Sequence, residues 1–282
     1  MSLSLRMAEP MFRTFENAEL KADTFGLSHV TVKSKALGRR ADVTVFIPEG
    51  LEAWADAPVV TLLHGVFSSH WAWAFKGEAH LTARALISQK LIPPMVLLMP
   101  SDGLWGDGSG YIKHADADYE KWILEEVPTI AYALTSACSS GSPRFLAGLS
   151  MGGFAALRLG AKFPNAYRAI SAHSAVTNVA QLTQLIEEDT AGWSSNPSDQ
   201  DIFAAMQSAH VKLPSIRFDC GTEDALLPAN RELHHKMASH GLIHIFEELS
   251  GGHDWDYWKS NLHRKLLFFA KIGKGVAANA ST

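Results

Sequence analysis

Gly148-Leu149-Ser150-Met151-Gly152 matches the pattern G-x-S-x-G, in which a serine stands on a sharp turn between a strand and a helix. The turn crowds the backbone, so the residues two before and two after the serine must be nearly free of side chain, and both are glycine. Residues 144–147 form a short apolar run typical of a buried strand, and residues 152–160 are typical of a helix. The stretch therefore predicts that Ser150 is presented as a nucleophile. The alternative is a glycine- and serine-rich loop without chemistry.

Two later segments supply the partners that a serine nucleophile requires. Residues 215–220 predict a strand that runs into Gly221-Thr222-Glu223-Asp224, and residues 243–249 predict another strand, followed by a glycine-rich loop with His253. The order Ser150, Asp224, His253 is that of α/β-hydrolases and differs from the order in two other well-known serine hydrolase folds. We therefore predict a triad of nucleophile Ser150, acid Asp224 and base His253.

Three other carboxylates lie near the positions that the acid could take. They are Asp219, Glu223 and Asp254. Asp219 is expected inside its strand, and Asp254 adjoins His253 and should point away from the imidazole ring. Asp224 is therefore the preferred acid, to be compared with Asp254 by mutation.

An earlier apolar strand should deliver the oxyanion hole. Residues 57–63 lead into His64-Gly65-Val66, and a tetrahedral intermediate needs two preorganised N–H donors aimed at its oxygen. We predict that these donors are the amides of Val66 and Met151, the second lying at a helix N-terminus, where the helix dipole favours negative charge. His64 precedes the serine in sequence and is expected to brace this loop rather than to act as the base.

Six segments appear together in an order that carries a family resemblance. The chain resembles the esterase D-like group of α/β-hydrolases, which includes tributyrin-type esterases, S-formylglutathione hydrolases, feruloyl and acetyl-xylan esterases and mycolyltransferases of the antigen 85 type. The resemblance covers residues 28–270 and implies the same triad and the same two oxyanion donors. The segments are Leu62-Leu63-His64-Gly65, residues 98–103, residues 119–128, residues 147–153, Cys220-Gly221-Thr222-Glu223-Asp224 and His253-Asp254-Trp255.

One residue departs from part of that group. Formylglutathione hydrolases usually carry a histidine directly after the Ser-Met-Gly-Gly stretch, where this chain has Phe154. Tributyrin-type members usually have an aromatic residue there, so they are the closer likeness.

The composition is typical of a globular enzyme and does not indicate a strongly charged partner. The chain has 282 residues and a net charge of −4 with histidine neutral, and no run of lysine or arginine exceeds two. Neither nucleic acid nor an anionic membrane is expected as a partner. Cys138 and Cys220 do not indicate a disulfide, and the first residues lack the apolar stretch of a signal peptide, so the cytoplasm is the expected location. A homo-oligomer is left open.

The order of expected elements predicts one α/β-hydrolase domain over residues 1–282, with a core over about 28–270. Residues 28–33 and 40–47 predict an antiparallel hairpin, and strands near 59–63, 96–99, 145–147 and 169–172 alternate with helix candidates. This alternation is typical of a mostly parallel central sheet with helices on both faces. The helices are expected over 76–89, 119–135, 152–162, 229–240 and 257–271.

Residues 178–213 interrupt this rhythm. A helix-like segment over 181–188 gives way to a stretch rich in serine, glycine and asparagine. An insertion at this point usually covers the active site as a small cap. The alternative is a surface excursion without function.

Aromatic residues gather in the loops where a ligand should bind. Phe67, Trp71, Trp73 and Phe75 follow the oxyanion segment, and Trp105 and Tyr111 follow the next strand. Such residues could simply be core, but Phe67, Trp71 and Trp105 are our candidates for substrate binding.

The sequence thus predicts a serine carboxylic-ester hydrolase that works through an acyl-enzyme and favours short acyl chains. The substrate is a small-molecule ester, and no cofactor or metal is expected. The alternatives are an S-formylglutathione hydrolase, a carbohydrate or feruloyl esterase, an acyltransferase, and a catalytically silent hydrolase fold that only binds a ligand.

Overall fold

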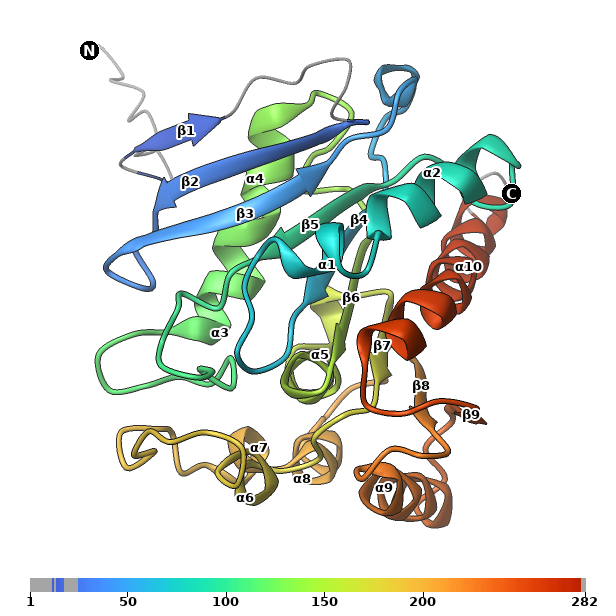
Figure 1. The fold of residues 1–282 in the computed structure, drawn as a ribbon. Coiled ribbons are helices and arrows are strands. Elements are labelled where there is room, and N and C mark those ends of the chain that lie inside the picture. The colour runs from blue at the N-terminus through green and yellow to red at the C-terminus, as the bar shows by residue number, and fades with distance from the viewer. Residues whose placement is uncertain (1–11, 13, 18–24, 280–282) are drawn as a thin grey trace, which may run out of the picture.

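The computed structural model describes residues 12, 14–17 and 25–279. Its centre is one nine-stranded sheet with the strand order β1-β2-β3-β5-β4-β6-β7-β8-β9 (Figure 1). The first three strands and β5 pair antiparallel, whereas the pairs from β5 through β9 are parallel. The strands are β1 Phe15–Asn17, β2 Leu27–Lys33, β3 Arg40–Phe46, β4 Val59–Leu63, β5 Val96–Pro100, β6 Arg144–Leu149, β7 Ala169–His173, β8 Ser215–Gly221 and β9 Ile245–Leu249.

Helices cover both faces of this sheet. They are α1 Ala72–Phe75, α2 Ala79–Ser88, α3 Tyr119–Lys121, α4 Val127–Leu134, α5 Met151–Lys162, α6 Val179–Leu182, α7 Pro197–Gln200, α8 Ile202–Gln207, α9 Leu227–Ser239 and α10 Trp255–Asn279. A π-helical turn over Trp122–Glu126 joins α3 to α4, and short 3₁₀ turns lie at Leu51–Ala53 and Pro164–Ala166.

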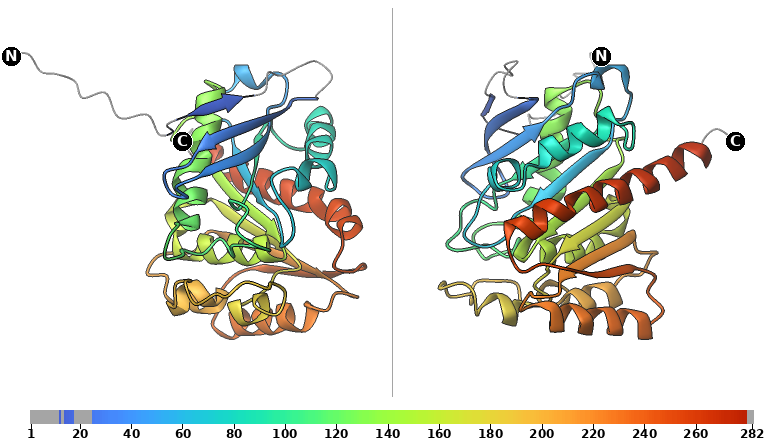
Figure 2. Two further views of the ribbon diagram at one scale, coloured as in Figure 1. Left: turned by 60° about the vertical axis from the view of Figure 1, so that its left-hand side comes forward. Right: turned by 45° about the vertical axis from the view of Figure 1, so that its right-hand side comes forward.

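The two layers can be assigned from the packing of alternate strand residues. In β4, Val59 and Leu63 join the core shared with α4, α5, α8 and α9, whereas Val60 and Leu62 join the core shared with α1, α2 and α10. This alternation follows from the two-residue period of a strand that is buried on both faces. The left view of Figure 2 shows α4 and α5 on one side of the sheet and α2 and α10 on the other. The predicted α/β-hydrolase fold is confirmed.

Most expected elements are present, with differences that have physical causes. The helix expected over 76–89 begins only at Ala79, as α2, because Glu78 adopts the left-handed conformation with φ 47°, and the short α1 ends before it at Phe75. The helix expected over 181–188 was wrong in extent, because α6 ends at Leu182 and turns follow it. The segment 178–213 also supplies α8, which packs on α5 and provides the crossover between β7 and β8. Helix α8 of the expected insertion therefore belongs to the core. The role of the segment 178–213 as a cap stays a prediction.

The turn between β6 and α5 is where the backbone is most crowded. Ser150 has φ 52° and ψ −119°, a conformation that a non-glycine residue adopts only under constraint. A Cβ on Gly148 would lie 2.0 Å from the carbonyl oxygen of Gly152, and a Cβ on Gly152 would lie 2.4 Å from that of Leu63. The amide of Ser150 donates to the carbonyl of His173 at 3.0 Å. The neighbouring strands β4 and β7 thus hold the turn from both sides.

These approaches predict unequal costs for two glycine substitutions. Gly152→Ala should lower the free energy of unfolding by about 1–3 kcal/mol or more, because backbone carbonyls cannot move aside for the methyl group. Gly273→Ala, in α10 with its nearest contact at 3.7 Å, should be neutral or stabilising by up to about 1 kcal/mol. Urea denaturation measures both, and equal unfolding free energies would contradict this view of the turn.

Candidate active site

Ser150, His253 and Asp224 lie in one line of hydrogen bonds. The Oγ of Ser150 is 3.1 Å from Nε2 of His253, and Nδ1 of His253 is 2.8 Å from Oδ2 of Asp224. The carboxylate can only accept, so Nδ1 carries the proton and Nε2 is left to accept the serine proton. The fold thus brings together three residues that are separated by 103 and 29 positions in the chain. This is the geometry of a nucleophile, a base and an acid that orients the base.

The environment of Asp224 keeps its carboxyl group ionised. Asp224 is buried, and its Oδ1 accepts from the Leu226 amide at 2.8 Å. Burial by itself would raise the pKa, but hydrogen bonds from His253, Ser174 and the Leu226 amide outweigh it, so the pKa of Asp224 lies below its usual value. A negative charge at Asp224 stabilises an imidazolium at His253 when the base takes a proton.

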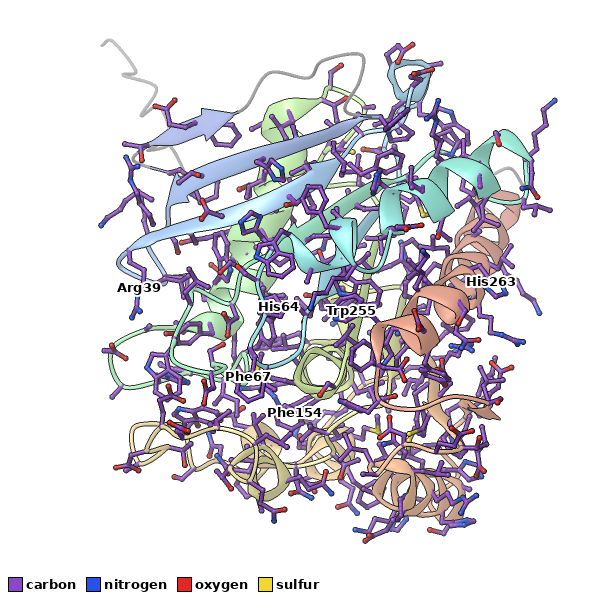
Figure 3. All side chains as sticks on the ribbon, in the orientation of Figure 1. Arg39, His64, Phe67, Phe154, Trp255 and His263 are labelled. Atoms are coloured by element: carbon purple, nitrogen blue, oxygen red, sulfur yellow. The ribbon has the colours of Figure 1, made fainter. Side chains whose placement is uncertain are left out.

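The loop that carries His253 is anchored by its neighbours in α10. Trp258 packs edge-on against the His253 ring at 4.9 Å, and its indole N–H donates to Oγ of Ser174 at 3.3 Å. Trp255, which Figure 3 labels, packs in turn against Trp73, with the ring centres 5.6 Å apart. Asp254 is engaged elsewhere, since its Oδ1 accepts from the Tyr257 amide at 2.9 Å at the start of α10. Asp254, the acid next to the base in sequence, therefore has another partner.

The segment predicted to supply an oxyanion donor lies against the nucleophile. A Cβ on Gly65 would lie 3.2 Å from Cβ and 3.7 Å from Oγ of Ser150. Within the described part of the chain, the amides of Val66 and Met151 donate to no protein group, whereas the next amide, Phe67, donates to Asp107 at 2.8 Å. Two free donors beside the serine fit an oxyanion hole, and this assignment stays a prediction.

His64 forms hydrogen bonds to two loops. Its Nδ1 donates to the Gly65 carbonyl at 2.7 Å, and its Nε2 accepts from the Asp102 amide at 3.2 Å. Both ring nitrogens are therefore used to hold two loops together. The geometry agrees with the bracing role expected for His64.

The loop after β5 closes over Met151. Asp102 is buried and accepts from the amides of Leu104 and Ser109, at 3.1 and 2.8 Å, which folds the loop back. The Gly110 amide then approaches Sδ of Met151 at 3.3 Å. A Cβ on Gly108 would lie 2.6 Å from the same sulfur. Little free volume is left on this side of the elbow.

The aromatic candidates divide into exposed and engaged rings. Phe67 is 69% exposed and Trp71 37%, so both can meet a ligand. Trp105 packs against His114 at 4.6 Å and Trp193 at 5.6 Å, which fastens the 178–213 segment to the loop after β5. Substrate binding by these three residues stays a prediction.

Two further rings after β4 differ in burial. Trp73 is buried and donates to the Leu63 carbonyl at 2.9 Å, so it belongs to the packing of α1 on the sheet. Phe75 is 62% exposed, and its ring faces His29 of β2 at 6.1 Å.

A network of buried charges that was not predicted lies beneath the elbow. Asp219 of β8 accepts from Nδ1 of His173 and from the hydroxyl of Tyr257, both at 2.7 Å, and pairs with Arg217 at 2.5 Å. Burial alone would raise the pKa of Asp219, but the charges and hydrogen bonds of its partners hold it well below the usual range. Since Tyr257 follows the His253 loop and His173 accepts from the Ser150 amide, this network connects the segments that carry base and nucleophile.

Lys265 ties α10 to the elbow itself. It is fully buried, and its Nζ donates to the carbonyl of Gly148 at 3.0 Å. Burial pulls the pKa of Lys265 well below its usual value. The sequence does contain a signal for these residues, because Arg217 and Asp219 share one strand face and Lys265 lies among the apolar core residues of α10.

Another buried cluster fixes the 178–213 segment to the core. Arg158 of α5 donates to the Tyr111 carbonyl at 2.7 Å and pairs with Glu120 and with Asp199 of α7. Lys162 also pairs with Glu120, at 2.7 Å, and with Asp199. Buried ions that are fully paired hold their segments in one arrangement, since removing one partner leaves an uncompensated charge.

The described residues contain neither a cluster of metal ligands nor a membrane-spanning helix. Over 12, 14–17 and 25–279, no group of three or more histidine, cysteine, aspartate or glutamate side chains is placed to hold a metal ion. Both cysteines are free. In the same ranges no helix is long and apolar enough to cross a membrane.

Comparison with known proteins assigns this chain to a family. The sequence profile of the esterase family, described as "Putative esterase", matches residues 34–269. The match covers most of the chain, so the chain belongs to this family. It is an esterase that hydrolyses carboxylic esters, and the predicted resemblance is confirmed.

Individual relatives are distant in sequence and close in fold. An acetyl esterase from Caldicellulosiruptor saccharolyticus is 23% identical over 230 residues, which is 75% of this chain and 82% of that protein. The solved structure of a ferulic acid esterase is similar with a TM-score of 0.74 at 25% identity, covering 92% of this chain and 99% of that one. The S-formylglutathione hydrolase from Staphylococcus aureus has a TM-score of 0.73 at 18% identity, covering 86% and 98%.

The geometry predicts which acid orients the base. Asp224→Asn should lower kcat by about 10⁴-fold, because the amide holds His253 in the wrong tautomer. Asp254→Asn should cost less than about tenfold, since asparagine also caps a helix well. Steady-state kinetics with a nitrophenyl ester compare the two, and the reverse ranking would move the acid away from Asp224.

Proposed function

We propose that this esterase works through an acyl-enzyme on Ser150, with His253 as base and Asp224 as its orienting acid. The observation that supports this most directly is the pair of hydrogen bonds from Ser150 Oγ to His253 and from His253 to Asp224, at 3.1 and 2.8 Å. Membership of an esterase family favours this function over a protein that only binds a ligand.

The reaction follows from the proton positions. Nε2 of His253 takes the Ser150 proton while Oγ attacks the ester carbonyl, and the imidazolium is stabilised by Asp224. The amides of Val66 and Met151 donate to the carbonyl oxygen as it becomes negative. The imidazolium then gives its proton to the leaving alcohol. Water repeats these steps on the acyl-enzyme and releases the acid; another alcohol in its place would give acyl transfer.

Short acyl chains are the proposed substrates. The loop after β5 packs onto Met151 with little free volume, and Trp71 is a bulky ring on the segment after Val66. The named activity of the acetyl esterase relative agrees with a small acyl group. An ester with an aromatic acyl group, such as a ferulate, is the second candidate. It is supported by the exposed ring of Phe67 next to Val66 and by the ferulic acid esterase structure.

Burst kinetics test the acyl-enzyme. Nitrophenyl acetate should release about one equivalent of nitrophenol per enzyme before the steady state, provided that hydrolysis of the acyl-enzyme is the slower step. Ser150→Ala should lose the burst and lower kcat by roughly 10⁶-fold while it still folds. Retention of more than a few per cent of activity in pure Ser150→Ala would sink the assignment.

The acyl preference can be measured with nitrophenyl esters from acetyl to dodecanoyl, with methyl ferulate added. Each methylene that fits contributes about 0.8 kcal/mol, so kcat/KM should rise over the first carbons, peak between acetyl and butyryl and fall beyond roughly eight carbons. Trp71→Ala should move the peak to longer chains, and Phe75→Ala, whose ring faces β2, should not. A wild-type optimum at decanoyl or dodecanoyl would refute the proposed preference for short acyl chains.

A further inference from the structure

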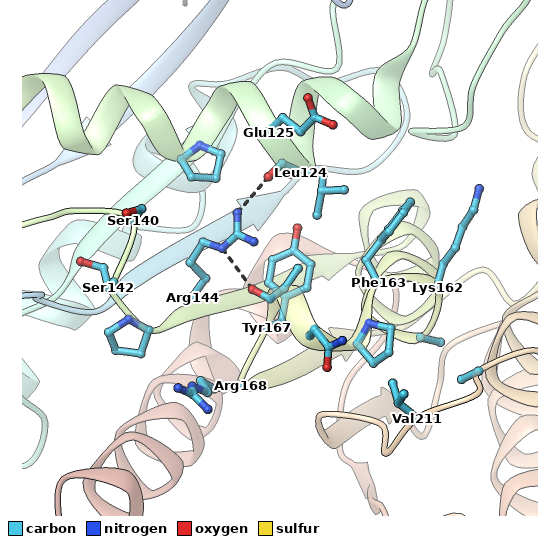
Figure 4. Close-up of a pocket in the computed structure, with 18 of the residues that line it drawn as sticks. Leu124, Glu125, Ser140, Ser142, Arg144, Lys162, Phe163, Tyr167, Arg168 and Val211 are labelled. Atoms are coloured by element: carbon cyan, nitrogen blue, oxygen red, sulfur yellow. Dashed lines mark hydrogen bonds between the residues drawn. The ribbon is translucent and has the colours of Figure 1, made fainter. Parts of the chain in front are cut away.

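A cavity lies at the other end of the sheet from Ser150. It encloses about 980 Å³ and is lined from the amino ends of β6 and β7 and the approach to β8 (Figure 4). Arg144 is the first residue of β6, whereas Ser150 follows its last. A six-residue strand spans roughly 20 Å, so this cavity is separate from the triad.

Arg144 reaches into this cavity with part of its guanidinium unused. Its Nε donates to the Ala166 carbonyl at 3.1 Å and its Nη1 to the Leu124 carbonyl at 2.9 Å. Within the described ranges, Nη2 has no hydrogen-bond partner, and no carboxylate pairs with Arg144. Two backbone carbonyls thus orient the guanidinium of Arg144. Its remaining N–H donors and its positive charge are left available to a ligand.

Tyr167 offers a second unused donor at the same place. Its ring packs under the Arg144 guanidinium, 5.4 Å from the ring centre, and Figure 4 shows its hydroxyl on the same side as that guanidinium. Tyr167 is 5% exposed, and its buried hydroxyl has no hydrogen-bond partner among the described residues. Burial raises the pKa of Tyr167 to about 12, so the hydroxyl keeps its proton at neutral pH. An unpaired buried donor is costly and uncommon in a native protein.

The remaining walls combine positive charge with apolar surface. Arg168 lines the cavity and also pairs with no described carboxylate, while Glu125 is engaged by Lys121. Lys162 is neutralised by Glu120 and Asp199. Apolar surface comes from Leu124, Pro128, Tyr132, Phe163 and Pro164.

We propose that this cavity binds a small organic carboxylate, with its charged group on Arg144 and Tyr167 and its apolar body against the wall around Phe163. A guanidinium fork and a hydroxyl suit the two oxygens of a carboxylate. The ligand needs an apolar body because a small anion alone would leave the aromatic and proline surface of the cavity uncovered. The site is independent of ester hydrolysis.

Calorimetric titration with benzoate tests the proposal, with benzamide as its uncharged counterpart and inorganic phosphate as an anion without an apolar body. Benzoate should bind at least about tenfold more tightly than either, because hydrogen bonds to a charged group are strong and the ring adds burial. The affinity should be unchanged after Ser150 has been blocked with diethyl nitrophenyl phosphate, which would place the ligand away from the triad. Equal binding of benzamide or phosphate, or no binding of benzoate, would overturn the proposal.

Two variants locate the site. Tyr167→Phe removes only a hydroxyl without a partner, so it should fold at least as stably as the wild type and weaken benzoate about tenfold. Arg144→Gln should abolish binding, whereas Arg231→Gln, which removes an exposed arginine paired with Glu248, should leave it unchanged. If Tyr167→Phe is more stable and binds benzoate as the wild type does, the hydroxyl is only an unsatisfied core group and the assignment is wrong.

Discussion

The close approach of three backbone segments at Ser150 is the constraint on which the site depends. Gly152 lies against the end of β4 so closely that no side chain fits, and the Ser150 amide is held by β7. The same contact sets Gly65 beside the nucleophile, so the turn that strains Ser150 also brings the expected oxyanion segment to it. The carboxyl ends of three central strands, β4, β6 and β7, supply this precision without a ligand, because these strands are paired neighbours.

Asp219 in β8 and Asp224 in the loop after it have different roles. Asp224 lies past β8 and holds the exposed His253, whereas Asp219, five residues earlier, lies inside the sheet with His173, Arg217 and Tyr257. Buried charges are expensive unless they are fully paired, so the inner group favours one arrangement of its strands. That arrangement includes α10, whose first turn follows the His253 loop. Asp219 thus supports the geometry in which Asp224 orients His253.

The sequence predicts the parts of this protein that follow local rules. Glycines flanking Ser150, strand-sized apolar runs and the order of Asp224 and His253 were sufficient for the fold and the contacts between those three residues. The network around Asp219 was missed because its partners come from elements that only the tertiary fold brings together. The packing of Trp105 against His114 and Trp193 could not be predicted for a related reason, since the contacts of an aromatic ring depend on the surface packed against it. Helix α8 was hidden in a segment whose composition is typical of a loop.

A single covalent labelling measurement tests the triad most directly. Diethyl nitrophenyl phosphate should add one diethyl phosphoryl group to Ser150, found by intact mass and peptide mapping. The rate should fall by orders of magnitude in His253→Ala, because the neutral hydroxyl is a weak nucleophile without its base. Labelling at another residue, or an unchanged rate in His253→Ala, would contradict the line of hydrogen bonds from Ser150 to Asp224 as the source of reactivity.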